Sequence, residues 1–312
     1  MRIADGRGLI LGEGQRNLHC VACGGGYAWG GCATSPSITV RIDPATLTTE
    51  EVRHPVCGGL HNFSLDGTHL WVAHASGHLS RLHPETMQTD DLAIPVASGQ
   101  RPFAYCVQAG GGYVWVGYYT DPCTVLRIDP AHSHRRRELV IAEAPMWALR
   151  DLAWDGRRLW ASVYDVPGRL IIIEPEFDGY QVMDLGEDNM LPTSLAFDGE
   201  RVWAGCDSRP ARLVAVDPAT GELEVHVLHE ASSCARGVTV AAGGVWVGLY
   251  TDPGQIVRLD PATGEFEMCE LPRGYCNVRG LVVADGILWA GLQGIRYEPS
   301  AVFAIPLVGE GQ

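Results

Sequence analysis

The sequence has no lysine, because all 23 of its basic residues are arginine. This absence excludes Schiff-base chemistry and a lysine general base. The sequence also lacks any run of the ~20 apolar residues that a membrane helix requires. The first residues, MRIADGRGLILGEGQ, show neither the apolar segment nor the cleavage pattern of a signal peptide. We therefore expect a soluble, cytoplasmic protein that does not bind a membrane.

Positive charge is scarce as well, since the formal net charge is −14. A chain this acidic is a poor partner for a phosphate backbone, so we expect no nucleic-acid ligand. The ten cysteines are irregularly spaced, and Cys20 and Cys23 form a CxxC pair with no second pair to complete a zinc ribbon. In a reducing compartment most of these thiols are expected to be reduced and buried.

One motif recurs along the whole chain. The segment GGGYVWVGYYTDPCTVLRIDPA, from Gly110, is nearly repeated by AGGVWVGLYTDPGQIVRLDPATGE, from Ala242. Alignment on the aromatic residue gives spacings of 42 to 45 residues between Trp29, Trp71, Trp115, Trp160, Trp203, Trp246 and Trp289. Short β-branched runs separated by Gly and Pro favour strands over helical repeats. The period predicts an all-β, seven-bladed β-propeller with four-stranded blades, which forms one domain over residues 1–312.

The order of strands within a blade follows from the motif. The inner strand precedes the DG turn, the second strand carries the Trp, the third is the VxRxDP segment, and the fourth follows DPATG. The last repeat ends after three strands, so we expect the N-terminal strand at Gly8 to Leu11 to close the last blade. Antiparallel order places the constant turns on one face and the segments that vary between blades on the other.

The variable face contains the candidate site residues. Ten residues before each Trp, at the start of the inner strand, stand polar or aromatic side chains: His19, His61, Tyr105, Arg150, Thr193, Arg236 and Arg279. Three residues after each Trp, entering the same face, stand Cys32, His74, Tyr118, Val163, Cys206, Leu249 and Leu292. We expect the first set, and the polar members of the second, to meet at the mouth of the central channel.

Imidazole and thiol groups gather in the first two blades. His19, His61, His74 and Cys32 are a donor set that suits a divalent transition metal such as Zn, Cu, Ni or Fe. The alternative is that these histidines bond backbone carbonyls or carboxylates. No organic cofactor is indicated.

Guanidinium groups gather in blades four, six and seven. Arg150, Arg236 and Arg279, with Asp151 and Thr193 beside them, predict a site for a small anionic ligand, since each guanidinium presents a planar fork of donors. Alternatively, these arginines pair with Asp151 or with the loop residues Asp121, Asp165, Asp207 and Asp252, which we interpret first as turn-forming residues.

The repeat, from DGxxLW to RIDPxTG, resembles that of the seven-bladed propellers related to streptogramin B lyase. This resemblance implies the same fold and a site at the channel mouth, where that family uses histidines that start the inner strands of adjacent blades; His19 and His61 match this position. It also implies a metal-assisted elimination. The family's glutamates have no counterpart, because Cys32 and His74 stand three residues after the Trp, and Asn17 and Gly59 stand two residues before the histidines.

Two hypotheses follow. In the first, the protein is an enzyme that eliminates or hydrolyses a small anionic metabolite or peptide natural product, with His19, His61, Tyr105 and Tyr118 as proton-transfer groups. In the second, it is a non-catalytic propeller that binds a partner protein or a metabolite at the same mouth.

Overall fold

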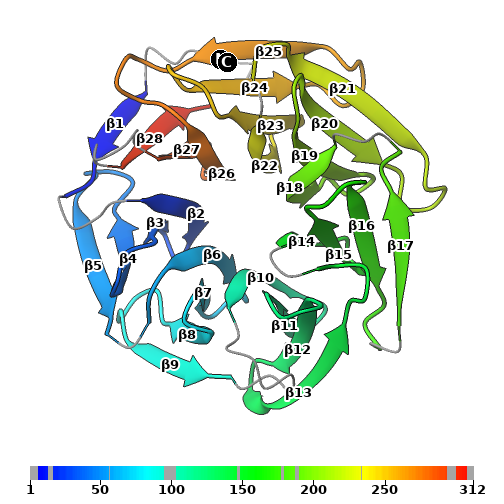
Figure 1. Cartoon of the computed structure of the whole chain (residues 1–312). Coiled ribbons are helices and arrows are strands. Elements are labelled where there is room, and N and C mark those ends of the chain that lie inside the picture. The colour runs from blue at the N-terminus through cyan, green and yellow to red at the C-terminus, as the bar shows by residue number, and fades with distance from the viewer. Residues whose placement is uncertain are drawn as a thin grey trace.

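Seven β-sheets form a ring around a central channel (Figure 1). The computed structural model describes residues 6–12, 17–55, 57–94, 103–145, 148–176, 179–186, 190–232, 234–293 and 300–307. Over these ranges every regular element is a β-strand and no helix occurs, so none is present that has the length and hydrophobicity to cross a bilayer. Each sheet has four antiparallel strands, which confirms the predicted seven-bladed propeller.

The first four blades follow the chain from the N-terminal side. Blade 1 consists of β2 (Leu18–Gly24), β3 (Tyr27–Cys32), β4 (Ser37–Ile42) and β5 (Thr49–His54). Blade 2 consists of β6 (Leu60–Leu65), β7 (Leu70–His74), β8 (His78–Leu82) and β9 (Thr89–Ala93). Blade 3 consists of β10 (Ala104–Gly110), β11 (Tyr113–Tyr118), β12 (Thr124–Asp129) and β13 (His132–Val140). Blade 4 consists of β14 (Leu149–Trp154), β15 (Leu159–Val163), β16 (Arg169–Ile173) and β17 (Tyr180–Asp184).

The last three blades complete the ring. Blade 5 consists of β18 (Leu191–Phe197), β19 (Val202–Asp207), β20 (Ala211–Val216) and β21 (Leu223–His229). Blade 6 consists of β22 (Ala235–Ala241), β23 (Gly244–Leu249), β24 (Gln255–Leu259) and β25 (Phe266–Glu270). Blade 7 consists of β26 (Val278–Ala284), β27 (Ile287–Leu292), β28 (Ala301–Pro306) and, from the other end of the chain, β1 (Arg7–Ile10).

The N-terminal strand closes the ring as predicted. Strand β1 pairs antiparallel with β28, from Arg7 opposite Ala304 to Ile10 opposite Ala301, and covers the outer edge of blade 7 (Figure 1). Directly after it, Leu11 is buried in the cluster between blades 7 and 1. Both ends of the chain thus belong to one sheet, which removes the open seam that a three-stranded last blade would leave.

The repeated Trp explains how neighbouring blades pack. The seven rings are at most 2% exposed, and each lies in an apolar cluster with residues of the next blade. Truncating such a ring to alanine costs about 3–5 kcal/mol. Trp29, for example, contacts the cluster built around Leu60 and Phe63 of blade 2.

The constant DG turns lie on the face away from the variable loops. In blade 4 the Asp155 side chain accepts hydrogen bonds from the backbone N–H groups of Arg157 and Arg158 and from Trp160 Nε1. The next residue, Gly156, has φ +90°, which a side chain would strain. Asp66 and Asp198 do the same for the Trp of blades 2 and 5. This face is therefore built for turn formation and blade anchoring.

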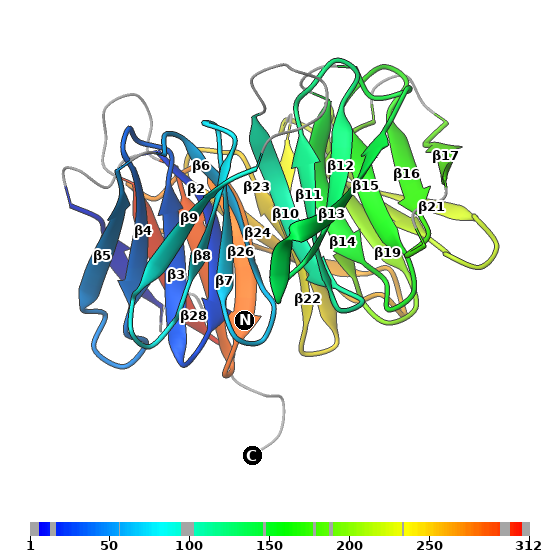
Figure 2. The ribbon, with the colours of Figure 1, turned by 90° about the horizontal axis from the view of Figure 1, so that it is seen from below.

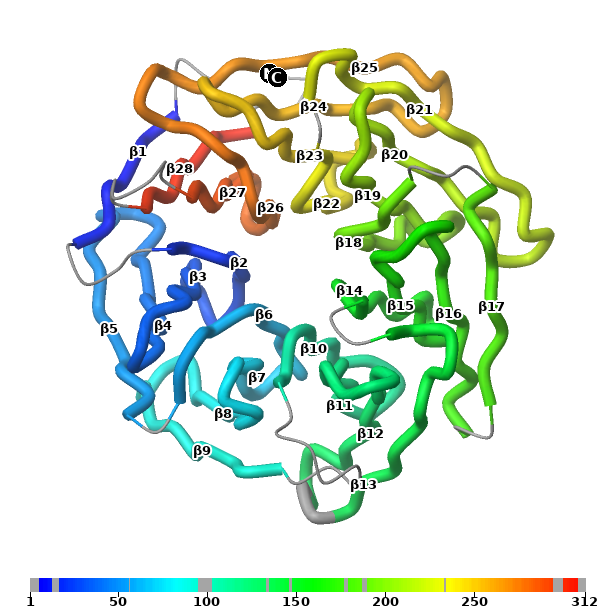
Figure 3. Tube along the Cα trace, viewed as in Figure 1, coloured from blue at the N-terminus to red at the C-terminus, as the bar shows by residue number. Residues whose placement is uncertain are grey.

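The opposite face holds the starts of the seven inner strands. Figure 3 shows β2, β6, β10, β14, β18, β22 and β26 arranged around the channel, and Figure 2 shows the strands running between the two faces of the disc. Residues far apart in the sequence consequently meet at one channel mouth.

Candidate functional site

A β-bulge starts every inner strand, and the candidate residues sit on these bulges. His19 is the extra residue between the paired positions Leu18 and Cys20, and blades 2, 3, 5 and 7 shift in the same way. In blade 4 the shift spans Arg150 and Asp151, and in blade 6 it directly follows Arg236, which is paired with Gly248. A bulge re-aims a side chain that regular pleating would direct elsewhere. The bulges explain why the residues ten positions before each Trp face the channel instead of the space between blades.

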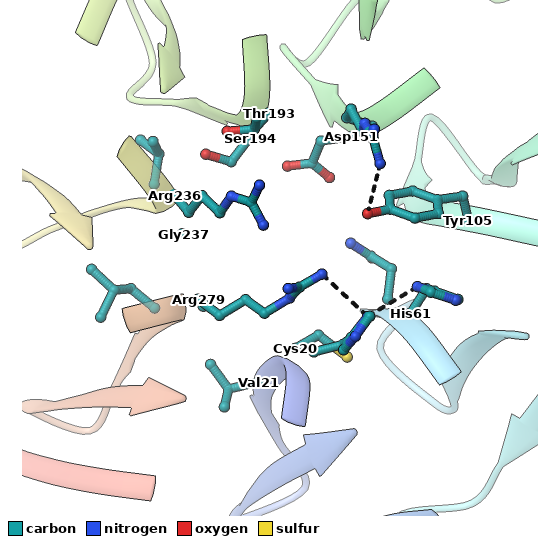
Figure 4. Close-up of a pocket in the computed structure, with 16 residues that line it drawn as sticks. Cys20, Val21, His61, Tyr105, Asp151, Thr193, Ser194, Arg236, Gly237 and Arg279 are labelled. Carbon is teal, nitrogen blue, oxygen red and sulfur yellow. Dashed lines mark hydrogen bonds between the residues drawn. The ribbon is translucent and has the colours of Figure 1, made fainter. Parts of the chain in front are cut away.

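The inner-strand residues enclose a chamber of about 160 Å³ at the channel mouth. All seven blades contribute to its lining: His19, His61, Tyr105, Arg150, Asp151, Thr193, Arg236 and Arg279, together with Cys20, Asn62 and Ser194. Figure 4 shows Arg236 and Arg279 extending side by side toward the centre, opposite Tyr105 and His61. The volume admits a molecule of several non-hydrogen atoms but not a drug-sized ligand.

Three guanidinium groups enter this chamber with one carboxylate in ion-pair range. Arg236 lies 3.6 Å from Asp207 Oδ2. Within the described part of the chain, no carboxylate lies within 4.0 Å of Arg150 or Arg279. Burial, followed by repulsion from Arg236, lowers the pKa of Arg279. The chamber is thus a pocket of positive charge in an acidic protein.

Neutral groups hold the two unpaired arginines in place. Arg150 lies over the rings of Tyr164 and Tyr105, at 4.5 and 5.3 Å from their centroids, and donates to Tyr105 Oη at 3.3 Å. Arg279 donates to Gln293 Oε1 at 2.8 Å. These contacts fix the geometry of the guanidiniums without neutralising their charge, as a preorganised anion site requires.

The two channel histidines are in direct contact. His19 Nδ1 lies 3.0 Å from His61 Nδ1, and the ring of His61 stacks on Tyr105 with centroids 4.8 Å apart. Burial, helped by the positive charge of Arg279, lowers the pKa of both imidazoles, that of His61 to about 4. At neutral pH both rings are therefore uncharged.

Asp151 and Thr193 line the chamber, but their polar atoms are largely used by the backbone. The carboxylate of Asp151 accepts the N–H groups of Leu152 and Leu195, and burial raises the pKa of Asp151 to about 7. Thr193 Oγ1 donates to backbone carbonyls at 3.0 and 3.1 Å. Asp151 does not pair with Arg150, which we considered from their adjacency. Its carboxylate instead ties blade 4 to blade 5.

Two buried polar atoms beside the chamber have no partner within the described residues. These are Arg150 Nε and Ser194 Oγ. An unsatisfied buried donor in a folded protein calls for an explanation, and a bound ligand or an ordered water supplies one.

The structure does not bring three of the predicted site residues to the mouth. Cys32, His74 and Tyr118 are each 0% exposed and lie between blades. His74 bonds Ser37 Oγ and Ser80 Oγ, and Tyr118 donates to the carbonyl of Gly77. Side chains alternate along a strand, so a residue three positions after the Trp points to the opposite sheet face from the Trp, which is equally buried. These positions correct our prediction that they enter the channel.

The predicted four-ligand metal cluster is consequently not assembled. His19 and His61 meet, but His74 and Cys32 belong to separate inter-blade spaces. Among the described residues, no three His, Cys, Asp or Glu side chains are placed to hold a metal ion. Both nitrogens of His19 are also engaged in hydrogen bonds. Binding of a divalent transition metal elsewhere in the protein stays a prediction.

Several site residues lie one position further along, and sequence reasoning missed all of them except Asp207, which it named as a possible partner of the arginines and which pairs with Arg236. Four residues after the Trp stand Tyr119, Tyr164, Asp207, Tyr250 and Gln293 in blades 3 to 7. Asp207 is the last residue of β19, and the other four directly follow the second strand of their blade. Tyr164 Oη donates to Asp207 Oδ2 at 2.9 Å, and Tyr250 Oη donates to Gln293 Oε1 at 2.9 Å. They form a second ring of polar groups behind the arginines. The signal was present, because the same positions hold alanine in blades 1 and 2.

Comparison with known proteins places the fold. A crystal structure of a catalytically inactive virginiamycin B lyase from Staphylococcus aureus with quinupristin superposes with a TM-score of 0.81 at 13% identity, covering 96% of this chain and 99% of that one. The likeness shows the fold. It confirms the resemblance to this group of propellers at the level of architecture, and at this identity it says nothing of the reaction.

Other propellers are almost as similar. The WD40 repeats of RRP9 give a TM-score of 0.79 at 11% identity, covering 98% of both chains. U3-55K gives 0.77 at 12% identity, covering 97% of this chain and 99% of that one. No family model and no curated protein matches the sequence.

Proposed function

We propose that the channel mouth binds a small anionic metabolite and that the protein acts on it as an enzyme, by elimination or hydrolysis. One observation carries the proposal: three guanidiniums share a chamber of about 160 Å³ in which only Arg236 has a carboxylate in ion-pair range among the described residues. Concentrated positive charge in a partly closed site attracts an anion, and planar donor forks suit a carboxylate or a phosphate. The three arginines occupy a repeat position that holds His, Tyr or Thr in the other four blades, so no structural need common to all blades explains them, and this supports a role in ligand binding.

The groups beside the arginines supply the chemistry. Tyr105 Oη accepts a hydrogen bond from Arg150, so its own proton is available to a developing oxyanion in the chamber. His61 is uncharged at neutral pH, since its pKa is about 4, and accepts a proton from the bound molecule. The arginines stabilise the negative charge that this transfer leaves behind. No step in this scheme uses a metal.

Thermal unfolding in the presence of anions tests the binding step. We expect phosphate, sulfate or a small carboxylate to raise the melting temperature, since a ligand at 100 times its Kd adds about 2.7 kcal/mol of stability. Arg279→Gln should abolish the shift. The matched control is Arg201→Gln, because Arg201 is partly exposed and pairs with Glu224 outside the chamber. If no anion in the panel stabilises the wild type, or if both variants respond alike, the binding proposal is wrong.

Turnover tests the catalytic step separately. NMR spectra of small carboxylates and phosphate esters incubated with the protein should show a product for the ligand that stabilises most. His61→Gln should retain the anion-dependent shift and lose the product. Binding without any product in the wild type would reduce the proposal to a metabolite-binding propeller.

A protein-binding scaffold is the second candidate, and one surface feature favours it. The outer strands β21 and β25 expose Val225, Val227, Phe266 and Met268, each 38–44% accessible. Exposed apolar side chains on outer strands suit contact with another protein. Val225→Glu with Val227→Glu should abolish such an interaction and leave the anion response unchanged, which separates the two candidates.

A further inference from the structure

A chain of hydrogen bonds links an arginine of blade 7 to the histidine of blade 2. Arg279 donates to Gln293 Oε1 at 2.8 Å, and Gln293 Nε2 donates to Asn17 Oδ1 at 2.6 Å. His19 Nε2 lies 3.2 Å from the same Asn17 oxygen, and His19 Nδ1 lies 3.0 Å from His61 Nδ1. Every link joins side chains, so each bond needs one donor and one acceptor.

The guanidinium sets the direction of the whole chain. It has no acceptor atom, so the amide of Gln293 must present its oxygen to Arg279. Tyr250, which also donates to that oxygen at 2.9 Å, agrees with this orientation. The amide nitrogen of Gln293 then faces Asn17, which must present its oxygen in turn. An oxygen only accepts, so the proton between Asn17 and His19 belongs to His19 Nε2.

The two histidines complete the sequence. An uncharged imidazole carries one proton, so His19 Nδ1 is an acceptor when His19 Nε2 is protonated. Arg279 Nη2, at 3.4 Å, also points a donor at His19 Nδ1. The bond between the rings must therefore be donated by His61 Nδ1, which leaves the lone pair of His61 on Nε2. Burial lowers the pKa of both rings, and so favours the uncharged forms that this reasoning assumes.

The free nitrogen of His61 is open to a bound molecule. His61 Nε2 has no hydrogen-bond partner among the described residues. It is also absent from the buried polar atoms that lack a partner, so solvent can reach it. A Cβ built on Gly59 would lie 3.5 Å from it, an ordinary van der Waals distance.

We infer that Gln293, Asn17 and His19 are positioning residues that fix the tautomer of His61, so that His61 Nε2 is the proton acceptor of the site. The role of His61 Nε2 as proton acceptor rests on the proposed function, whereas the tautomers of His19 and His61 can be measured without any ligand. In the step, an O–H or C–H bond of the ligand breaks, an N–H bond forms at His61 Nε2, and the bonding electrons stay on the ligand facing Arg150 and Arg236. The positive charge of the new imidazolium is shared between the two ring nitrogens of His61. His61 Nδ1–H donates its hydrogen bond to His19 Nδ1, as it does before the transfer.

Nitrogen-15 chemical shifts of the imidazoles test the inference in the ligand-free wild-type protein. We expect His61 to be protonated on Nδ1 and His19 on Nε2, with signals assigned by their loss in His61→Gln and His19→Gln. A wild-type His61 protonated on Nε2, or a positively charged His19 at pH 7.5, would overturn the inference. Anion-dependent melting is measured independently, so failure of the relay is distinguishable from failure of the ligand site.

Two substitutions of similar size give opposite expectations. In Gln293→Glu the new carboxylate only accepts, so Asn17 must turn its amide nitrogen toward both neighbours. His19 Nε2 then becomes the acceptor, and both tautomers should exchange, which moves the proton of His61 to Nε2. In Asn17→Asp the acceptor at His19 is kept, and Asp tolerates the φ of +59° at this position, so the wild-type tautomers should persist. Unchanged tautomers in Gln293→Glu would contradict the relay.

Discussion

Two pairs of histidines in this propeller have nearly the same separation and different surroundings. The rings of His19 and His61, at the channel mouth, have centroids 4.7 Å apart, and those of His54 and His74, between blades 1 and 2, have centroids 4.8 Å apart. In the second pair both residues are 0% exposed, and each of the four ring nitrogens has a side-chain partner: Ser37, Ser80, Thr39 and Asp91. In the first pair one nitrogen, His61 Nε2, has no partner among the described residues.

The difference separates a structural network from a candidate site. A fully satisfied, sealed cluster stabilises one arrangement of the core and offers nothing to a ligand. An incompletely satisfied pair beside unpaired arginines retains hydrogen-bonding capacity for a molecule from solution. The two pairs have the same residue types, and only the hydrogen-bond partners of the individual ring nitrogens distinguish them.

The largest effect is expected from a substitution in the buried pair of His54 and His74. His74→Ala removes one buried hydrogen-bond partner from each of the hydroxyls of Ser37 and Ser80 and opens a cavity, so the free energy of unfolding should fall by about 3 kcal/mol. Urea unfolding at pH 7.5 measures this loss. A loss below about 1 kcal/mol would mean that the network is not a structural element of the interface between blades 1 and 2.

The stability of the protein in acid should depend on His61, which belongs to the channel pair of His19 and His61. Its pKa is about 4 in the fold and 6.5 in the unfolded chain, so the unfolded state binds the proton first. The stability that His61 contributes is complete above pH 6.5 and is lost as the pH falls toward 4, by about 2 kcal/mol at pH 5. His61→Gln should therefore lose about 2 kcal/mol less than the wild type between pH 7.5 and 5. Parallel curves for the two proteins would contradict the buried, uncharged state of His61.

The smallest effect on stability is expected from truncating the open pair at neutral pH. His61→Ala removes a ring that is mostly buried but borders the chamber and stacks on Tyr105, so about 1 kcal/mol should be lost in urea unfolding at pH 7.5. If His61→Ala is as damaging as His74→Ala, the channel histidines are structural and the comparison fails.

The fold could be predicted because its signal is repeated. Seven Trp residues at a nearly constant spacing specify seven equivalent packing units, and the missing fourth strand in the last repeat predicts the closure by β1. The inner-strand residues could be found for the same reason, since polar side chains replace apolar ones at one repeat position.

The rest of the site depended on details that the repeat does not encode. Whether a residue beyond the Trp faces the core or the channel is decided where the strand ends. Both tyrosines are buried, but Tyr118 is still paired with Thr124, whereas Tyr119 lies past the strand and stacks on Tyr105 with centroids 4.7 Å apart. Two adjacent residues therefore differ in role: the first packs between blades, and the second contacts a residue that lines the chamber. The role of Asp207, which we interpreted first as a turn-forming residue, likewise depends on Arg236 from the next blade.

The central claim is that the arginines of the channel mouth form an anion site, and an anomalous diffraction experiment with selenate tests it most directly. Selenate matches sulfate in shape and charge, and its selenium can be located in the crystal. We predict a selenium peak in the chamber between Arg150, Arg236 and Arg279. Peaks confined to the outer surface, with the chamber lacking any at saturating selenate, would contradict the account.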